Sequence, residues 1–337
     1  MTLDSLSAPS DRSAAPFEQA TALAARLDGE IGRVIIGQPQ VRREILISLL
    51  AGGHCLLRGV PGLAKTLLIR TLADAVDLRF SRIQFTPDLM PSDILGTEVI
   101  EEDTATGKRH VRFIPGPVFA NIILADEINR TPPRTQAALL EAMQEYQVTV
   151  GGVRHALERP LFVLATENPI EQEGTYPLPE AQLDRFMFNV LIDYPDPDDE
   201  RRILAETTTG VERAARPVAT GADLEAARRL VRDLPAAANV VDFALRLIRA
   251  TRPADANAPQ VTRDWVRWGV GPRGGQYLIL GAKAAALLDG RTVPSLEDVV
   301  QVALPVLRHR VLVNFQANAD GITPDDVIRK LLDAVRP

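Results

Sequence analysis

The feature that most constrains this chain is a glycine-bearing turn between an apolar strand and an apolar-periodic helix. Residues 59–66 read Gly-Val-Pro-Gly-Leu-Ala-Lys-Thr, after the apolar run 55–57 and before the helical pattern of residues 67–76. Such a turn cradles phosphate, because loop amides and the positive end of the helix face the anion. Lys65 adds a point charge and Thr66 offers a hydroxyl to Mg²⁺. We therefore predict nucleotide contacts from Gly59, Val60, Pro61, Gly62, Leu63, Ala64, Lys65, Thr66 and Leu67.

A second motif distinguishes this segment from a chance glycine-rich turn. Residues 122–127 read Ile-Ile-Leu-Ala-Asp-Glu, a buried-strand pattern that ends in two adjacent carboxylates. Asp126 is placed to hold the Mg²⁺ shell, and Glu127 to polarise the attacking water. The competing interpretation, an acidic pair that caps the next helix, is less favoured after four consecutive apolar residues. Together the two motifs indicate hydrolysis of a nucleoside triphosphate.

The bulk composition limits the remaining classes. A chain of 337 residues suggests one large and one smaller domain, and its net charge of -6 argues against a protein dominated by nucleic-acid binding. The one cysteine, Cys55, excludes an internal disulfide, and the four histidines lack metal-ligand spacing. No apolar run reaches the ~18 residues of a membrane span. Residues 1–16 lack the pattern of a secretory signal, so we expect a disordered tail there and a cytoplasmic protein.

The order of the expected elements indicates an α/β fold. Apolar strands alternate with helices up to about residue 193, which predicts a parallel sheet sandwiched by helices. Two β-hairpins are inserted, at residues 98–113 and 148–156, the second around a Gly-Gly turn. A Pro- and Asp-rich break at residues 193–199 precedes five or six helical patterns. We predict a nucleotide-binding domain at 17–194 and a small all-α lid domain at 195–337.

Three further residues are candidates for the same site, each with an alternative. Asn168 follows a predicted strand and would reach the γ-phosphate or the water, although Asn before Pro is also ordinary turn chemistry. Arg185 either pairs with Asp184 or Glu180, or reaches a neighbouring subunit's γ-phosphate as an arginine finger. Arg273, at the start of a lid helix, either lies over the nucleotide or stands in solvent.

These residues in this order resemble the MoxR family of AAA+ ATPases, over roughly residues 32–312. The family's phosphate loop also commonly has Ala before Lys, and its acidic box is similar to residues 126–133. Residues 165–186 are close to a family signature, in which Gln usually stands in place of Glu167. The resemblance implies ATP and Mg²⁺ as ligands, with Thr66 and Asp126 at the metal. It further implies an adenine contact by Ile36 and Gly37, a first sensor at Asn168, an arginine finger at Arg185 and a second sensor at Arg273.

The resemblance also implies a homo-oligomeric ring, usually a hexamer, in which one subunit's finger completes the neighbour's site. MoxR-like ATPases are described as chaperones that remodel or activate protein partners, often with von Willebrand factor A domains, including metal or cofactor insertion. Two alternatives stay open: a chelatase motor subunit or nucleic-acid translocase on the same core, and a low-turnover ATP-dependent scaffold. The few cations of the 148–156 hairpin make nucleic acid the less favoured partner. Trp265 and Trp268 fit core packing or a subunit contact, with partner docking as the alternative.

Overall fold

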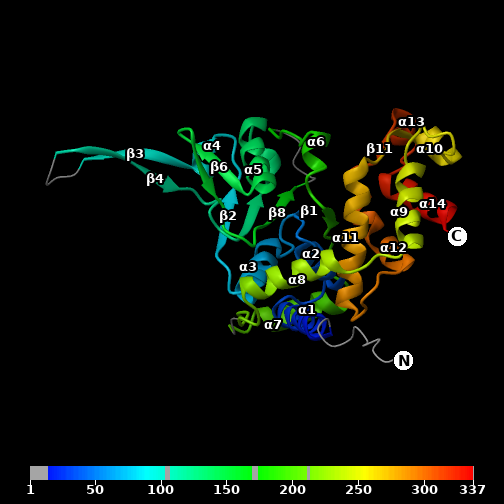
Figure 1. Ribbon diagram of the computed structural model, residues 1–337, viewed down its shortest axis with the longest axis horizontal. Coiled ribbons are helices and arrows are strands. Elements are labelled where there is room, and N and C mark those ends of the chain that lie inside the picture. Colours follow the sequence, from blue (N-terminus) through cyan, green and yellow to red (C-terminus); the bar gives the residue numbers. More distant parts are fainter. Residues whose placement is uncertain (1–13, 103–106, 169–173, 211–212, 337) are drawn as a thin grey trace, which may run out of the picture.

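The computed structural model describes residues 14–102, 107–168, 174–210 and 213–336. The chain folds around a five-stranded parallel sheet with strand order β2-β5-β8-β1-β9 (Figure 1). The predicted alternation of strands and helices is therefore confirmed. The first helix begins at Ala14 rather than at residue 17, and most of the predicted tail lies outside the described residues. The sheet strands are β1 (Cys55–Arg58), β2 (Phe80–Gln84), β5 (Ile122–Asp126), β8 (Phe162–Glu167) and β9 (Phe188–Leu191).

Each central strand is apolar on both faces, as expected for a parallel sheet that is covered by helices on both faces. Successive side chains of a strand point to opposite faces, so Cys55 and Leu57 join one core cluster while Leu56 joins the other. The first cluster lies under α1 (Ala14–Val34), α2 (Pro39–Ala51), α3 (Lys65–Ala75) and α8 (Gly221–Asp233). The second lies under α4 (Pro91–Leu95), the 3-10 helix η1 (Ile128–Arg130), α5 (Pro133–Glu145) and α6 (Glu180–Leu183).

Both predicted hairpins form. The first pairs β3 (Gly96–Glu102) with β4 (Arg109–Pro115) and projects far from the body (Figure 1), and its turn, 103–106, lies outside the described residues. The second pairs β6 (Gln147–Val150) with β7 (Val153–Ala156) around Gly151 and Gly152, whose positive φ values of 57° and 82° explain the two glycines. The Phe113 ring stacks on His155 with centroids 3.8 Å apart, so the bases of the two hairpins touch.

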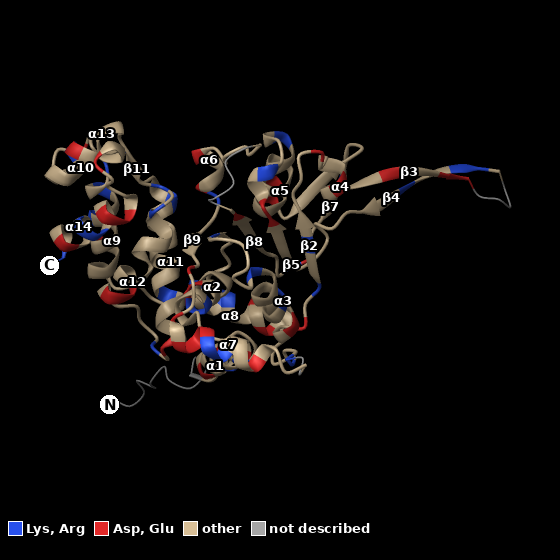
Figure 2. Ribbon diagram, turned by 180° about the vertical axis from the view of Figure 1, so that it is seen from behind, with Lys and Arg blue, Asp and Glu red and all other residues tan. Residues whose placement is uncertain are grey.

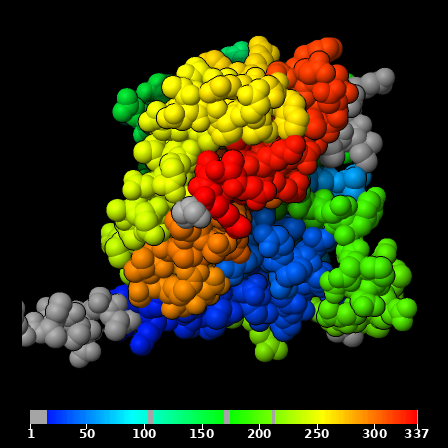
Figure 3. Space-filling view, turned by 90° about the vertical axis from the view of Figure 1, so that its right-hand side faces the viewer, coloured from blue at the N-terminus to red at the C-terminus, as the bar shows by residue number. Residues whose placement is uncertain are grey.

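The C-terminal part is helical, and side chains mark where its helices begin. Ser295 and Thr323 each accept a backbone N–H three residues on, and Asp298 and Asp326 bond back, which completes two capping boxes. These helices cover one side of the molecule (Figure 3). They are α9 (Ala238–Ala250), α10 (Gln260–Trp265), α11 (Pro272–Leu288), α12 (Leu296–Leu307), α13 (Phe315–Ala319) and α14 (Pro324–Val335).

The prediction of an all-α lid needs one correction. A two-stranded antiparallel sheet joins β10 (Val266–Trp268) to β11 (Leu312–Val313). Strands of two or three residues are too short to show an alternating pattern, so these two strands could not be predicted. Trp265 packs partly buried against the core, with the Lys330 ammonium 4.1 Å from its ring centroid, whereas Trp268 is 70% exposed. Core packing thus describes Trp265 but not Trp268.

The segment after the last strand of the sheet does not separate cleanly from the core. Helix α7 (Pro197–Thr207) follows the Pro- and Asp-rich break, with Asp196 accepting the N–H groups of Asp198 and Asp199 as its N-cap. Helix α8 then packs against α1, α2 and α11. The domain boundary after residue 194 stays a prediction. Among the described helices, none has both the length and the apolar composition to cross a membrane.

Candidate functional site

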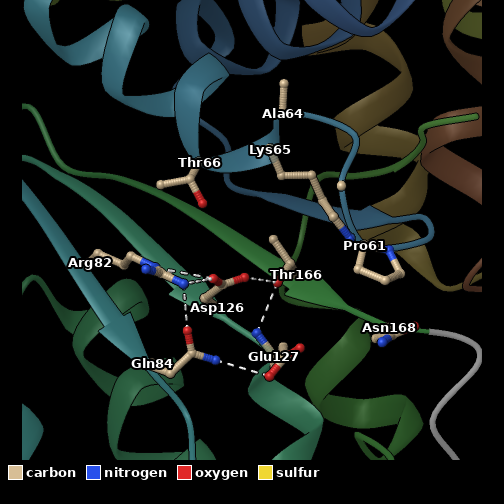
Figure 4. A pocket seen from close by; sticks show the side chains of 11 residues that line it. Pro61, Ala64, Lys65, Thr66, Arg82, Gln84, Asp126, Glu127, Thr166 and Asn168 are labelled. Carbon is tan, nitrogen blue, oxygen red and sulfur yellow. Dashed lines mark hydrogen bonds and ion pairs between the residues drawn. The ribbon is translucent and has the colours of Figure 1, made fainter. Parts of the chain in front are cut away.

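A cavity of about 450 Å³ opens at the carboxyl edge of the sheet, where the phosphate loop and the acidic strand meet (Figure 4). Strands β5, β8 and β1 are neighbours in the sheet, and the carboxyl ends of parallel strands meet at one edge. The predicted residues Lys65, Thr66, Asp126, Glu127 and Asn168 therefore line one cavity. The full lining is Pro61, Gly62, Ala64, Lys65, Thr66, Arg82, Gln84, Asp126, Glu127, Thr166 and Asn168.

The backbone of the phosphate loop explains its glycines. At Gly59 a Cβ atom would lie 2.4 Å from the carbonyl O of Ile192, so the loop begins in close contact with the end of the sheet. Gly62 has a φ of 85°, which L-residues rarely adopt. Ala64, at the N-cap of α3, has a φ of 54° and is therefore strained. Glu127 is strained in the same way, with a φ of 56°. Such outliers concentrate at functional sites.

Lys65 is held inside the loop that it is expected to serve. Its Nζ donates a hydrogen bond of 2.5 Å to the carbonyl O of Gly59. Burial lowers the pKa of the Lys65 ammonium, and the carboxylates of Asp126 and Glu127 oppose that shift. The side chain of Thr66 follows, with its hydroxyl turned toward Asp126 (Figure 4). A cation and a hydroxyl thus lie opposite the two carboxylates.

A buried threonine on β8 orders the acidic pair. Thr166 Oγ1 donates to Asp126 Oδ1 over 2.7 Å and accepts the backbone N–H of Glu127 over 2.8 Å. On the other side, Glu127 Oε2 accepts from Gln84 Nε2 and from Arg130 Nη1, each over 2.9 Å. The two carboxylates therefore point into the cavity in fixed directions. Sequence reasoning missed Thr166 and Gln84, although Thr166 stands in the family signature.

Asn168 is 6% exposed and separates the main cavity from a second one of about 240 Å³. The preceding residue, Glu167, is the unusual acid of the signature, and the structure supplies its partner. Arg58 Nε, at the end of β1, donates to Glu167 Oε2 over 2.6 Å. The extra negative charge beside Asn168 is therefore paired with a cation on the neighbouring strand.

The expected adenine contact lies next to the phosphate loop. An apolar pocket of about 150 Å³ adjoins the main cavity, since Gly62 and Ala64 line both. Gly37 and Val60 do not line it. Gly37 has a φ of 71° and approaches Asp199, so it shapes the segment instead. The pocket's lining includes the predicted residues Ile36, Leu63 and Leu67, together with Val34, Ile35, Gln38, Leu68, Ile192, Pro195, Ile203 and Thr207.

The two predicted arginines of the neighbouring elements are not brought to this cavity. Arg273 Nη1 donates to Asp184 Oδ2 over 3.0 Å, and the buried Arg310 donates from Nε to Asp184 Oδ1 over 2.8 Å. Arg185 follows Asp184 directly, and its carbonyl O accepts from the Tyr277 hydroxyl over 3.4 Å. Arg273 thus lies beside the predicted finger, because the Asp184 carboxylate holds it there, and not over the chain's own phosphate loop.

These residues fit a magnesium-bound nucleoside triphosphate. Carboxylate and hydroxyl oxygens are the donors that Mg²⁺ prefers, and Asp126 and Thr66 supply one of each. Lys65 and the N-terminus of the 11-residue helix α3 fit the phosphates. The apolar pocket beyond Ala64 fits a base. Among the described residues, no group of three or more His, Cys, Asp or Glu is arranged to hold a metal without such a ligand.

Comparisons with known proteins point to one family. Residues 54–188 match the ATPase family associated with various cellular activities (AAA), and residues 260–331 match an AAA lid domain. The chain is 42% identical to Chaperone MoxR1 of Mycobacterium tuberculosis, covering 91% of this chain and 80% of that protein. It is 32% identical to Protein MoxR of Paracoccus denitrificans, covering 88% and 91%.

A solved structure agrees with the fold over nearly the whole chain. A crystal structure of a proposed ATPase from Cytophaga hutchinsonii superposes with a TM-score of 0.88 and 38% identity, covering 96% of this chain and 97% of that one. The match therefore spans the phosphate loop, the acidic strand and the lid of this chain. The chain belongs to the MoxR family of AAA+ ATPases.

Proposed function

We propose that this protein binds ATP with Mg²⁺, hydrolyses it at sites shared between subunits of a ring, and uses the cycle to remodel protein partners. The observation that carries the proposal is that Lys65, Thr66, Asp126, Glu127 and Asn168 line a single cavity. They come from helix α3, which follows the phosphate loop, and from the carboxyl ends of two neighbouring strands, β5 and β8.

The roles follow from the geometry of the chain's own groups. Lys65 and the loop amides bind the phosphates, and Thr66 and Asp126 hold the metal, which supplies positive charge at the β- and γ-phosphates. Glu127 takes the proton of the attacking water, because its carboxylate faces the cavity and its backbone is fixed by Thr166. Asn168 orients that water or the γ-phosphate.

The proposal of shared sites is supported by the position of Arg185 and Arg273. Arg273 contacts Asp184, Arg185 follows Asp184 in the chain, and neither arginine lines the chain's own cavity, which supports a role at a neighbour's site. An arginine supplied from a neighbour can be worth ~10³ or more in rate. We therefore assign both arginines to the neighbouring subunit's site within a homo-oligomeric ring.

The kind of partner is inferred from the family and from the hairpin charges. MoxR1 is named a chaperone, which favours a protein partner, and a von Willebrand factor A domain is the specific partner that we propose. Both signs of charge occur on the β3–β4 hairpin (Figure 2). There Glu101 pairs with Arg112 and Glu102 with Arg109, so these two cations are matched by carboxylates. A surface that binds nucleic acid would present cations without paired carboxylates.

The test is the ATPase rate per subunit as a function of protein concentration. Wild type should rise steeply with concentration, while Glu127→Gln and Arg185→Ala should each lose most activity. A mixture of the two variants should recover part of it, because a subunit with an intact Glu127 then meets a neighbour with an intact Arg185. Arg246→Ala, an exposed arginine of α9, is the matched control and should behave as wild type. A rate per subunit that does not change with concentration and is the same in Arg185→Ala as in wild type would contradict the shared-site proposal.

A further inference from the structure

Both oxygens of the Asp126 carboxylate have hydrogen-bond partners within the chain. Its Oδ1 accepts from Thr166, and its Oδ2 accepts from Arg82 twice, from Nη2 over 2.7 Å and from Nε over 3.1 Å (Figure 4). A guanidinium therefore sits on the carboxylate oxygen that faces the cavity. Asp126 and Glu127 are the two residues of the described cavity lining that carry a negative charge.

The strand register explains why Arg82 reaches this place. On β2, Gln84 is the partner of Asp126, and Arg82 stands two residues earlier, on the same face of the strand. Arg82 Nη2 also donates to Gln84 Oε1 over 2.6 Å, and Gln84 in turn contacts Glu127. The side chain of Arg82 is 48% exposed, whereas that of Asp126 is 14% exposed. The guanidinium is thus held by its hydrogen bonds and not by burial, and it can leave without disturbing the core.

The charges of the cavity balance in this arrangement. Lys65 and Arg82 supply two positive charges to the lining, and Asp126 and Glu127 supply two negative charges. A divalent cation that enters alone meets no net attraction and must compete with a guanidinium for its carboxylate. A cation that enters bound to a triphosphate is accompanied by negative phosphate oxygens. The Arg82 guanidinium can then move its hydrogen bonds from Asp126 to these oxygens.

We propose that Arg82 is a resident counter-cation of the metal site. It occupies Asp126 in the nucleotide-free protein, competes with Mg²⁺ for that carboxylate, and so restricts metal binding to the moment when the nucleotide arrives. This inference rests on the proposed role of Asp126 as a metal ligand, and it adds an order of events to the proposed function: the metal enters with the phosphates and not before them.

The test measures metal binding without nucleotide. Mn²⁺ prefers the same oxygen donors as Mg²⁺ and is detected by its electron paramagnetic resonance signal. Titrating Mn²⁺ into the full, nucleotide-free chain should show an affinity roughly three- to tenfold higher for Arg82→Gln than for wild type, the range expected when a partly exposed hydrogen bond of ordinary net strength no longer competes. The gain should disappear in the double variant Arg82→Gln, Asp126→Asn. Arg82→Lys keeps the positive charge but loses the paired N–H donors of the guanidinium. This variant should show a smaller gain in Mn²⁺ affinity.

A matched control separates this effect from a general change of charge. Arg79 directly precedes β2, pairs with Glu158 and lies outside the cavity lining, so Arg79→Gln should leave Mn²⁺ affinity unchanged. An unchanged or weaker Mn²⁺ affinity in Arg82→Gln would overturn the inference, since Arg82 would then support Asp126 and not compete for it. Because no ATP is present, the result is readable even if hydrolysis fails. Conversely, if hydrolysis is normal but Mn²⁺ affinity is the same in wild type and in Arg82→Gln, only this inference is contradicted.

Discussion

Thr166 Oγ1 lies 2.7 Å from Asp126 Oδ1, and the same hydroxyl accepts the backbone N–H of Glu127. One side chain of β8 thus fixes the direction of both carboxylates that end β5. The hydroxyl is buried, and it acts as donor to one residue and acceptor from the next. The proposed metal ligand and the proposed base are therefore oriented together by one residue of the neighbouring strand.

Replacing Thr166 with Val should lower kcat by roughly tenfold or more, the usual range for losing a group that orients a metal ligand. Nucleotide affinity should change little, because Lys65 and the loop stay in place. Steady-state ATPase kinetics and equilibrium binding of a fluorescent ADP would measure the two effects separately. Thr166→Ser keeps the hydroxyl and should retain most of the wild-type kcat. Equal losses in both variants would show that the methyl group, and not the hydroxyl, is what matters.

The ion pairs at Asp184 should contribute very unequally to stability. Arg310, whose side chain is 2% exposed, depends on Asp184 for its charge partner, and burial lowers the pKa of its guanidinium against the opposing effect of that carboxylate. Asp184→Ala leaves a buried cation uncompensated and should lower the free energy of unfolding by about 3 kcal/mol. Arg273→Gln removes only a partner that is 41% exposed and should cost less than about 1 kcal/mol. Urea unfolding would compare them, and equal losses would contradict this account.

The phosphate loop and the acidic strand could be predicted because each carries its signal within a few consecutive residues. Gly62 needs its positive φ in any fold, and Gly151 and Gly152 specify a hairpin turn by themselves. The partners of these motifs could not be predicted in the same way. Arg82 meets Asp126 only because β2 is the neighbour of β5 in a sheet whose order differs from the order of the chain.

The contacts of Glu167 and of Arg273 in the lid could not be predicted either, because they also depend on how the elements pack. Arg58 reaches Glu167 across 109 residues, because β1 lies between β8 and β9. The position of Arg273 followed from α11 and its contact with Asp184, which no local pattern reports. Local chemistry identified which residues belong to the site, whereas packing decided which of them meet.

The Arg58–Glu167 pair should tune the site modestly. Arg58 is 38% exposed, so Glu167→Gln, which restores the residue usual in the family, should change the free energy of unfolding by less than about 1 kcal/mol. Glu167→Ala removes the acceptor next to Asn168 and should reduce kcat more than the Gln variant does. Chemical unfolding and ATPase assays on both variants would measure this. Equal losses of kcat in the two variants would mean that the charge itself, and not the acceptor oxygen, is required.

Ala64 should report the strain stored in the phosphate loop. Its φ of 54° suits glycine, so Ala64→Gly should raise the free energy of unfolding by about 1 kcal/mol. Ala25, an exposed residue within α1, provides the matched comparison. Ala25→Gly should lower stability by about 1 kcal/mol, because glycine is disfavoured in a regular helix. Thermal or urea unfolding would show the opposite signs, and a loss of stability in both variants would contradict the claim of strain.

The stability of the fold should fall as the pH is lowered through the range in which His54 titrates. His54 is fully buried between β1, β8 and α5: its Nδ1 accepts the N–H of Val163 over 3.1 Å, and its Nε2 lies 3.3 Å from the carbonyl O of Met143. Burial lowers the pKa of His54 to about 4, against an ordinary value near 6.5. Between these values the unfolded chain binds a proton that the native protein does not, so stability is complete above about pH 6.5 and is lost on acidification.

The size of this effect can be isolated by comparison with His54→Gln, which keeps a donor and an acceptor but does not titrate. The free energy of unfolding of wild type, minus that of the variant, should be constant above pH 7 and should fall by about 3 kcal/mol between pH 6.5 and 4. Other titrating groups, including His309, are present in both proteins and cancel in the difference. Urea unfolding in steps of half a pH unit would measure it. A difference that stays flat down to pH 4 would mean that the native protein accepts the proton at His54, and that the Nδ1 contact with Val163 is broken at little cost.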